Sequence, residues 1–205
     1  MLTDQKITDF LQNTAAGTAV PGGGSVSALS AALGAGLTEM VANLTIAKKG
    51  YEAVENDMQE IAETVKNLRE KLLSEVDNDS NAYNDVLAAF KLPKTTEAQK
   101  EQRARAIQAA MKNAARVPLG VAYDALQVMD LAEKVIRHGN RNAVSDGAVG
   151  AMMARTAVLG ALWNVRINLA SVNDNAFVEE MMRQVDKLES RVHEREKEIL
   201  SHVNV

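Results

Sequence analysis

The spacing of the apolar residues constrains this fold most, because they recur at intervals of three and four almost throughout the 205-residue chain. No segment of useful length alternates strictly between apolar and polar residues, as a half-buried strand does. A spacing of three and four gathers side chains on one face of an α-helix. The sequence therefore predicts an all-α protein, a single-domain bundle that spans residues 1–205.

Breaks in this pattern divide the bundle into about seven helices, some of them long. Gly50 and Gly139 end helices, and Val117-Pro118 is interpreted as the start of a new one, because proline is tolerated in a first turn. The expected helices span residues 3–16, 25–47, 52–90, 97–115, 119–137, 146–172 and 175–201.

Composition excludes several classes of function. With 23 basic and 27 acidic side chains the formal net charge is −4, which is unlike the basic excess of a nucleic-acid binder. Cysteine is absent, so disulfides and thiolate chemistry are excluded. The three histidines are scattered and form no HExxH pattern. The sequence therefore predicts an enzyme without a metal, if it is an enzyme.

The location follows from two observations. Asp4, Lys6 and Asp9 interrupt the N-terminus where the apolar core of a signal peptide would begin. The apolar segment 25–46 gathers its large side chains on one face, whereas a membrane-spanning helix is apolar all round. Those side chains are Val26, Leu29, Leu33, Leu37, Met40 and Leu44. We expect a cytoplasmic protein.

Small residues form another face of that segment, with Ala28, Ala32 and Gly36 four residues apart. Small side chains at this spacing let a second backbone approach closely. Tight packing inside the bundle is the favoured interpretation, and a helix–helix dimer contact is the alternative.

Asp79 interrupts the apolar stripe of the third expected helix, between Val76 and Tyr83. A carboxylate on a buried line is costly unless it is paired or hydrogen-bonded. Burial also raises a carboxyl pKa towards the range useful for proton transfer. Asp79 is therefore a candidate acid–base group, although a purely structural carboxylate is the alternative. Asp77 is expected to be more exposed.

Two polar segments are further candidates. Gly22, Gly23 and Gly24 open a helix and could present backbone N–H groups to an anion or a carbonyl, or form a plain flexible turn. Residues 137–146 combine amides, a hydroxyl, a carboxylate and two guanidiniums, either for ligand binding or as a loop capped by Asn142 or Ser145. Lys48 and Lys49 could attract an anionic ligand or serve only as a helix cap.

Taken in order, several blocks resemble the cyclodeaminase/cyclohydrolase family, which includes the deaminase module of formiminotransferase-cyclodeaminase and free-standing bacterial relatives. The resemblance spans nearly the whole chain. Its blocks are Pro21–Ser25, Met40–Thr45, Lys48–Tyr51, Asp77–Tyr83, Lys91–Lys94, Gly139–Asp146 and Asn164–Leu169.

This resemblance implies an all-helical, dimeric, folate-binding enzyme that needs no metal. The implied reaction closes 5-formiminotetrahydrofolate to 5,10-methenyltetrahydrofolate and releases ammonia. Close relatives instead hydrolyse or form the methenyl bridge, so a methenyltetrahydrofolate cyclohydrolase is the alternative. The transferase module of the bifunctional enzyme is missing from this sequence, so a separate formiminotransferase would supply the substrate.

The chemistry assigns roles to the candidate residues. Asp79 is the expected acid–base group, and Asp146 helps or orients. Residues expected to hold the pterin or the reacting amidine are Gly22, Gly23, Gly24, Ser25, Asn140, Asn142 and Ser145. Candidates for the glutamate tail are Lys48, Lys49, Arg137 and Arg141. A non-catalytic helical scaffold is a third reading, disfavoured because a scaffold needs neither Asp79 nor the polar density of residues 139–146.

Overall fold

The computed structural model describes residues 1–203, and that part of the chain forms helices and no strand. The prediction of an all-α bundle is confirmed. Short 3-10 turns occur at Leu2–Asp4, Glu52–Val54 and Arg141–Ala143. The α-helices are α1 (Ile7–Thr14), α2 (Gly23–Asn43), α3 (Glu55–Phe90), α4 (Glu97–His138), α5 (Val144–Leu169) and α6 (Asn175–Ser201).

One expected boundary is wrong: α4 continues through Pro118 as a single helix of 42 residues. Proline has no N–H and leaves the carbonyl of the residue four positions earlier without its helical partner. That carbonyl belongs to Ala114, and it accepts a hydrogen bond from Asn168 Nδ2 of α5 at 2.7 Å. A side chain from a neighbouring helix thus replaces the missing donor, which is why two expected helices are one.

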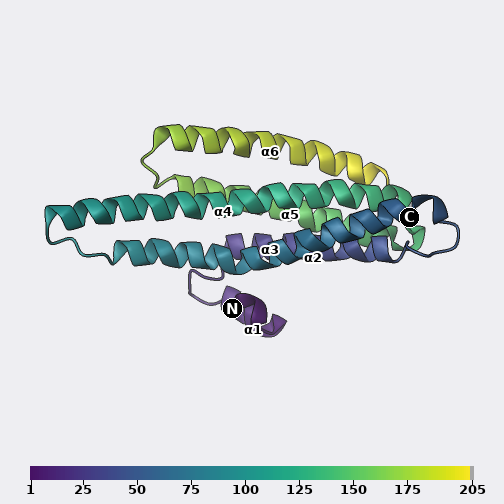
Figure 1. Ribbon diagram of the computed structural model, residues 1–205, viewed down its shortest axis with the longest axis horizontal. Coiled ribbons are helices and arrows are strands. Elements are labelled where there is room, and N and C mark those ends of the chain that lie inside the picture. Colours follow the sequence, from purple (N-terminus) through teal and green to yellow (C-terminus); the bar gives the residue numbers. More distant parts are fainter. Residues whose placement is uncertain (204–205) are drawn as a thin grey trace.

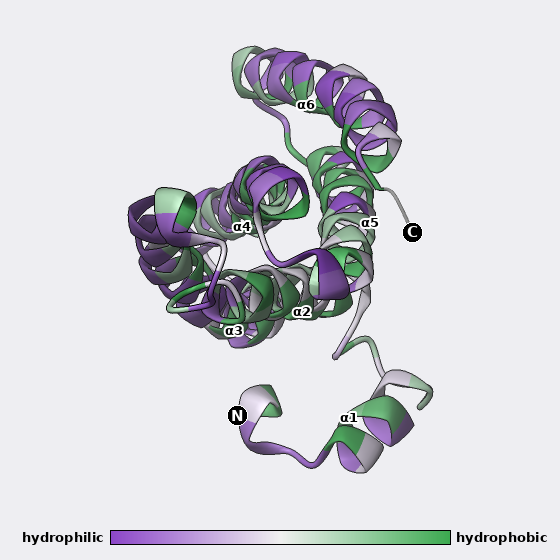
Figure 2. Ribbon diagram, turned by 90° about the vertical axis from the view of Figure 1, so that its right-hand side faces the viewer, coloured by the Kyte–Doolittle hydropathy of each residue, from purple (hydrophilic) through white to green (hydrophobic). Residues whose placement is uncertain are grey.

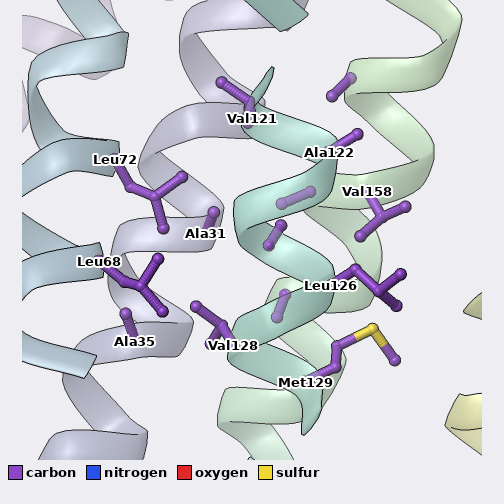
Figure 3. Close-up of a cluster of buried hydrophobic side chains, with 14 of the residues drawn as sticks. Ala31, Ala35, Leu68, Leu72, Val121, Ala122, Leu126, Val128, Met129 and Val158 are labelled. Atoms are coloured by element: carbon purple, nitrogen blue, oxygen red, sulfur yellow. The ribbon is translucent and has the colours of Figure 1, made fainter. Parts of the chain in front are cut away.

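The core lies where α2 packs against α3, α4 and α5 (Figure 3). The small face of α2 points into it: Ala28, Ala31 and Ala35 are completely buried. At the crossing with α5, a Cβ added to Gly34 would lie 2.7 Å from the Gly150 carbonyl oxygen. The small residues therefore serve close packing inside the bundle, as favoured from the sequence.

The long helices run side by side along the bundle, and α6 covers α4 and α5 from outside (Figure 1). Apolar side chains such as Met181 and Val185 bury one face of α6. Ion pairs flank that face, with Arg166 on Glu189 at 2.7 Å and Arg195 on Asp130 at 2.9 Å. Figure 2 shows the outcome: α6 carries much hydrophilic surface, while α5 is mainly apolar or neutral.

The N-terminal segment is anchored on α3, and α1 lies to one side of the long helices in both views (Figures 1 and 2), with Phe10 as its buried core residue. Asp77 holds the anchor, since its carboxylate accepts from the Leu2 N–H at 2.6 Å and from the Thr3 hydroxyl at 2.7 Å. Asp77 is only 8% exposed, so the expectation of an exposed Asp77 is wrong. A segment 74 residues away in sequence covers it, which helical periodicity cannot show.

Large apolar side chains on one face of α2 are exposed and do not form part of the core. Leu33 is 52% exposed, and Val26, Met40 and Leu44 are each more than a third exposed. By length and composition alone, Gly23–Asn43 and Arg141–Leu169 are apolar enough to cross a membrane, but 56% and 44% of their most apolar windows are buried inside the bundle. Core helices of bundles meet the same criterion.

Candidate functional site

A cavity of about 250 Å³ opens where the N-terminus of α2 meets α3, α4 and α5. Asp79 and Tyr83 of α3 line one wall, and Asn164 and Asn168 of α5 line another. The glycine run Gly22–Gly24 forms the third side. The cavity thus brings three of the blocks found in the sequence together in one chain.

Asp79 is half-buried, and its main polar partner is Ser25 at the start of α2. The Ser25 hydroxyl donates to Asp79 Oδ2 at 2.9 Å and also lies 3.1 Å from the Ser80 hydroxyl. Because a hydroxyl carries one proton, Ser80 donates to Ser25 while Ser25 donates to Asp79. Among residues 1–203 no cation forms an ion pair with Asp79.

Burial raises the pKa of Asp79 above its ordinary value, and hydrogen bonds from the Ser25 hydroxyl and backbone oppose the shift only in part. Desolvation disfavours the charged form, so the carboxyl holds its proton to a higher pH than an exposed aspartate does. The side chain is nevertheless not fully enclosed, because it lines the cavity. Beyond it on α3, Tyr83, Leu87 and Phe90 are exposed, so the apolar stripe identified in the sequence leaves the core near Asp79. Of these three residues, Tyr83 lines the cavity.

The glycines make this approach of helices possible. A Cβ on Gly24 would lie 2.0 Å from Asp79 Oδ1, and a Cβ on Gly23 would lie 3.0 Å from Asn164 Nδ2. Only residues without a side chain let the first turn of α2 touch both the carboxylate and the amide. The glycine run is thus required by close packing around Asp79 and does more than form a turn.

Asn164 and Asn168 are cavity residues that the sequence analysis did not assign to the site, although both fall in a block of the resemblance. Asn164 Nδ2 donates to the Gly160 carbonyl at 2.8 Å, and Asn168 Nδ2 donates to Ala114. Their amide oxygens remain as acceptors on the cavity wall. The available signal was their spacing of four, which puts two amides on one face of a helix.

The second polar constellation lies at the other end of α2, about 30 Å away by the helical rise over 20 residues. Its backbone is held tightly: the Asn140 N–H donates to Thr45 Oγ1 at 2.8 Å, and the Arg141 N–H donates to the Tyr51 hydroxyl at 3.1 Å. Asn140 Oδ1 accepts from the Asn142 N–H at 3.1 Å, so Asn140 caps this turn. The expected caps, Asn142 and Ser145, do not.

A larger hollow of about 800 Å³ lies at this far end, lined in part by Tyr51, Arg137 and Arg141. Arg137 also pairs with Glu133 at 3.3 Å. Lys48 and Lys49 are near it in sequence but do not line it. The side chains of Asn142, Ser145 and Asp146 make no hydrogen bond or ion pair within residues 1–203.

The predicted site residues therefore fall into two groups. One chain brings together Gly22, Gly23, Gly24, Ser25 and Asp79. It does not bring these to the remaining candidates, which lie at the far end: Lys48, Lys49, Arg137, Asn140, Arg141, Asn142, Ser145 and Asp146. Over the described part of the chain, no three His, Asp or Glu side chains are grouped as a metal site requires.

Comparison with known proteins identifies the family of this chain. The family model for formiminotransferase-cyclodeaminase matches residues 6–187, which is most of the chain. The chain belongs to this family. All the elements that form the cavity, from the glycine run to α5, lie inside the matched range.

The named relatives have two kinds of activity. A methenyltetrahydrofolate cyclohydrolase of Methylorubrum extorquens is 39% identical over 188 residues, covering 92% of this chain and 90% of that protein. A formimidoyltransferase-cyclodeaminase of Gallus gallus is 34% identical over 187 residues, which is 91% of this chain but 35% of the chicken protein. The chain thus matches about a third of the bifunctional animal enzyme.

A solved structure agrees with the fold as a whole. The formiminotetrahydrofolate cyclodeaminase of Thermotoga maritima superposes with a TM-score of 0.87 at 29% identity, covering 99% of this chain and 98% of that one. The names of both kinds of relative refer to a one-carbon derivative of tetrahydrofolate. The family members named here are enzymes, which is the class expected from the sequence.

Proposed function

We propose that this protein closes 5-formiminotetrahydrofolate to 5,10-methenyltetrahydrofolate and releases ammonia, with Asp79 as the acid–base group. The observation that carries the proposal is a carboxyl of raised pKa that lines an open cavity and has no cationic partner among residues 1–203. Because its pKa is raised, this carboxyl holds its proton to a higher pH than an exposed aspartate does, which favours a role in proton transfer.

The proposed reaction needs one side chain that can accept and donate a proton. N10 attacks the formimino carbon on N5 of the same molecule, so positioning supplies much of the acceleration. The formimino group reacts as its protonated amidinium, whose nitrogen already carries two hydrogens. A bond forms between N10 and this carbon, and Asp79 accepts the proton that N10 loses. Asp79 delivers this proton to the departing nitrogen, its bond to the carbon breaks, ammonia leaves, and the positive charge stays on the methenyl bridge. The proposal uses no metal and no covalent intermediate.

Asn164 and the first turn of α2 orient the substrate in this proposal. The Asn164 amide oxygen can accept a hydrogen bond from the pterin or the amidine, and the carbonyls and N–H groups of the glycine run lie on the facing wall. Gly23 and Gly24 let the first turn of α2 approach the Asn164 amide and the Asp79 carboxyl closely, which holds both groups at the cavity.

A second candidate is the hydrolysis of 5,10-methenyltetrahydrofolate. It is favoured by the 39% identity to a cyclohydrolase of nearly the same length. In that reaction the water oxygen would bond to the bridging carbon and Asp79 would take one proton from the water. One carbon–nitrogen bond of the bridge would break, and Asp79 would pass its proton to the nitrogen released. The second water proton would go to solvent, and the carbon would remain as a formyl group on the other nitrogen.

Partners follow from the substrate. We propose a cytoplasmic homodimer that receives 5-formiminotetrahydrofolate from a separate formiminotransferase. We further propose that Arg137 and Arg141, with Lys48 and Lys49 nearby, bind the anionic glutamate tail. Four cations at one end of an acidic protein form a local site for such a tail.

One assay decides between the two reactions. The protein is incubated separately with 5-formiminotetrahydrofolate and with 5,10-methenyltetrahydrofolate, while methenyl absorbance and ammonia are followed. We expect absorbance and ammonia to rise together with the first substrate. Loss of absorbance with the second and no reaction with the first would instead establish the cyclohydrolase. Inactivity on both would reject the proposal, and a chelator should change neither rate.

A further inference from the structure

Two amides of α5 set the polarity of its cavity wall, and the orientation of one of them, Asn168, depends on α4. The Asn168 Nδ2 group donates to the Ala114 carbonyl at 2.7 Å. A carbonyl oxygen only accepts hydrogen bonds, so the NH2 end of the amide faces Ala114 and the amide oxygen is turned away from it. Both residues line the cavity. The contact therefore leaves the Asn168 oxygen as the end of the amide that a ligand meets.

Pro118 is the reason that the Ala114 carbonyl takes a side-chain donor. In an uninterrupted helix this carbonyl accepts from the N–H four residues later, and proline has no N–H. Pro118 occupies that position inside α4. A flipped Asn168 amide would place two oxygens in contact and leave the carbonyl without a donor, which costs more than one hydrogen bond gains. The proline therefore holds the amide in a single orientation.

Asn164, one turn earlier on α5, presents its amide in the same sense. Its Nδ2 group donates to the Gly160 carbonyl at 2.8 Å, so its oxygen also remains as an acceptor. A spacing of four places the two amides roughly 5–6 Å apart on one face of the helix. Ile167, the third α5 residue that lines the cavity, is apolar, and no lysine or arginine lines it within residues 1–203. The α5 wall thus offers acceptors and no side-chain donor.

The facing wall, at the start of α2, has the opposite polarity. Gly23 and Gly24 line the cavity in the first turn of this helix. Backbone N–H groups in a first turn have no acceptor within their own helix, so they remain as donors. The neighbouring Ser25 hydroxyl donates to Asp79 instead. A ring between the two walls is bound best when one edge carries N–H groups and another carries a carbonyl.

Side chains of α4 also fix the end of α5, which runs beside it (Figure 1). Gln108 Nε2 donates to the Ser171 carbonyl at 3.2 Å, and Gln108 Oε1 accepts from the Asn173 N–H at 2.8 Å. Both partners follow directly after α5. Contacts from a rigid neighbouring helix hold a site residue precisely. The position of Asn168 and the direction of its amide are therefore both set by α4.

We propose that Pro118 is a positioning residue of the cavity: it turns the Asn168 oxygen towards a bound ligand, so that the α5 wall selects a ring edge that donates N–H groups. In the proposed function this is the pyrimidine edge of the pterin, whose amino group and ring N–H lie away from the reacting N5. The pterin carbonyl then accepts from the first turn of α2. The identity of the ligand rests on the proposed function, whereas the orientation of the amide does not.

The orientation of the amide is tested without a ligand. In isotope-labelled protein the NMR signals of the Asn168 side-chain amide are identified by their loss in Asn168→Ala, and their hydrogen exchange with solvent is measured. Pro118→Ala gives Ala114 a backbone donor, so exchange should become faster by on the order of tenfold. Pro93→Ala, at the exposed turn between α3 and α4, is the matched control and should change nothing. Equal exchange in Pro118→Ala and wild type would overturn the inference.

The selectivity is tested by equilibrium titration with tetrahydrofolate and with its analogue that carries a methyl group in place of the 2-amino group. Wild type and Pro93→Ala should prefer tetrahydrofolate by up to about tenfold, the weight of one neutral hydrogen bond. In Pro118→Ala this preference should fall by on the order of threefold, and in Asn168→Ala it should disappear. A purely structural role of Pro118 would weaken both ligands alike and keep their ratio, which would overturn the inference alone. A wild type that binds neither ligand would overturn the proposed function, and the selectivity with it.

Discussion

At the Gly22 end of α2 a carboxyl sits in a cavity with a raised pKa, whereas at the Leu44 end the polar groups near Asn140 are bonded to one another. Both ends are rich in polar residues in the sequence. The first end keeps Asp79 at a cost to folding, because burial disfavours its ionised form. The second end uses Thr45, Asn140 and Tyr51 to hold a turn. Polar density in the sequence therefore does not distinguish a carboxyl of raised pKa in a cavity from polar groups that hold a turn.

The largest effect should come from Asp79→Asn, which keeps the shape of the side chain but cannot carry a proton. We expect turnover to fall by roughly 10²–10⁴-fold with little change in substrate affinity. The thermal stability of the variant should instead increase. Because the folded pKa is raised, the ionised carboxylate destabilises the native state, and this cost appears as pH rises through the ordinary pKa. At pH 7 the asparagine variant should therefore melt at a higher temperature than wild type.

Asp77→Asn is the matched control, two residues away on the same helix. Its carboxylate accepts from Leu2 and Thr3 and lines no cavity, so the variant should lose stability and keep its turnover per folded molecule. Calorimetry and steady-state kinetics on one preparation of each variant give the comparison. An active, stabilised Asp79→Asn would remove Asp79 from the chemistry.

The next effect tests why α2 begins with glycines. A Cβ on Gly24 overlaps the Asp79 carboxylate, so Gly24→Ala should displace it and lower turnover by about tenfold to 10²-fold, the usual cost of misplacing a reacting group. Gly36→Ala, on the same helix, meets only Arg69 Cδ at 3.6 Å. That control should be active and more stable by about 1 kcal/mol, the difference in helix propensity. Equal activity of the two variants would mean that the close approach at Gly24 is unimportant.

The helical fold and the position of Asp79 could be predicted from the sequence, whereas contacts between distant segments could not. Periodicity gives the helical class and picks out Asp79, because a carboxylate on an apolar stripe is visible in one dimension. It misplaces the break at Pro118, since Asn168 lies 50 residues further along and supplies the missing donor. It also misplaces Asp77, which a distant segment covers. The sequence also does not show how far apart the two polar blocks lie in space. In the structure, α2 separates them by its whole length.

The Pro118–Asn168 pair gives a smaller effect, on stability. Asn168→Ala leaves the Ala114 carbonyl without a partner and should cost about 1–3 kcal/mol of unfolding free energy. Pro118→Ala restores a backbone N–H in the right place, so it should rescue most of this loss in the double variant. Urea denaturation of the four proteins measures the coupling. Additive losses would show that Asn168 does not replace the proline's missing donor.

The smallest effect concerns the cations at the Leu44 end. Lys48→Ala combined with Lys49→Ala removes one half-buried and one exposed positive charge, and a surface charge pair is worth about 0.2–1 kcal/mol. A polyglutamylated folate should then bind a few-fold more weakly, and a monoglutamyl folate should bind almost as before. Salt screens such contacts, so the difference between the two ligands should shrink as ionic strength rises. The measurement is a titration of both ligands at low and high salt. If the lysine variant treats both ligands alike, the same experiment on Arg137→Ala with Arg141→Ala tests the two cations that line the hollow. Equal losses there as well would assign the tail to the Gly22 end and leave the far end with a structural role alone.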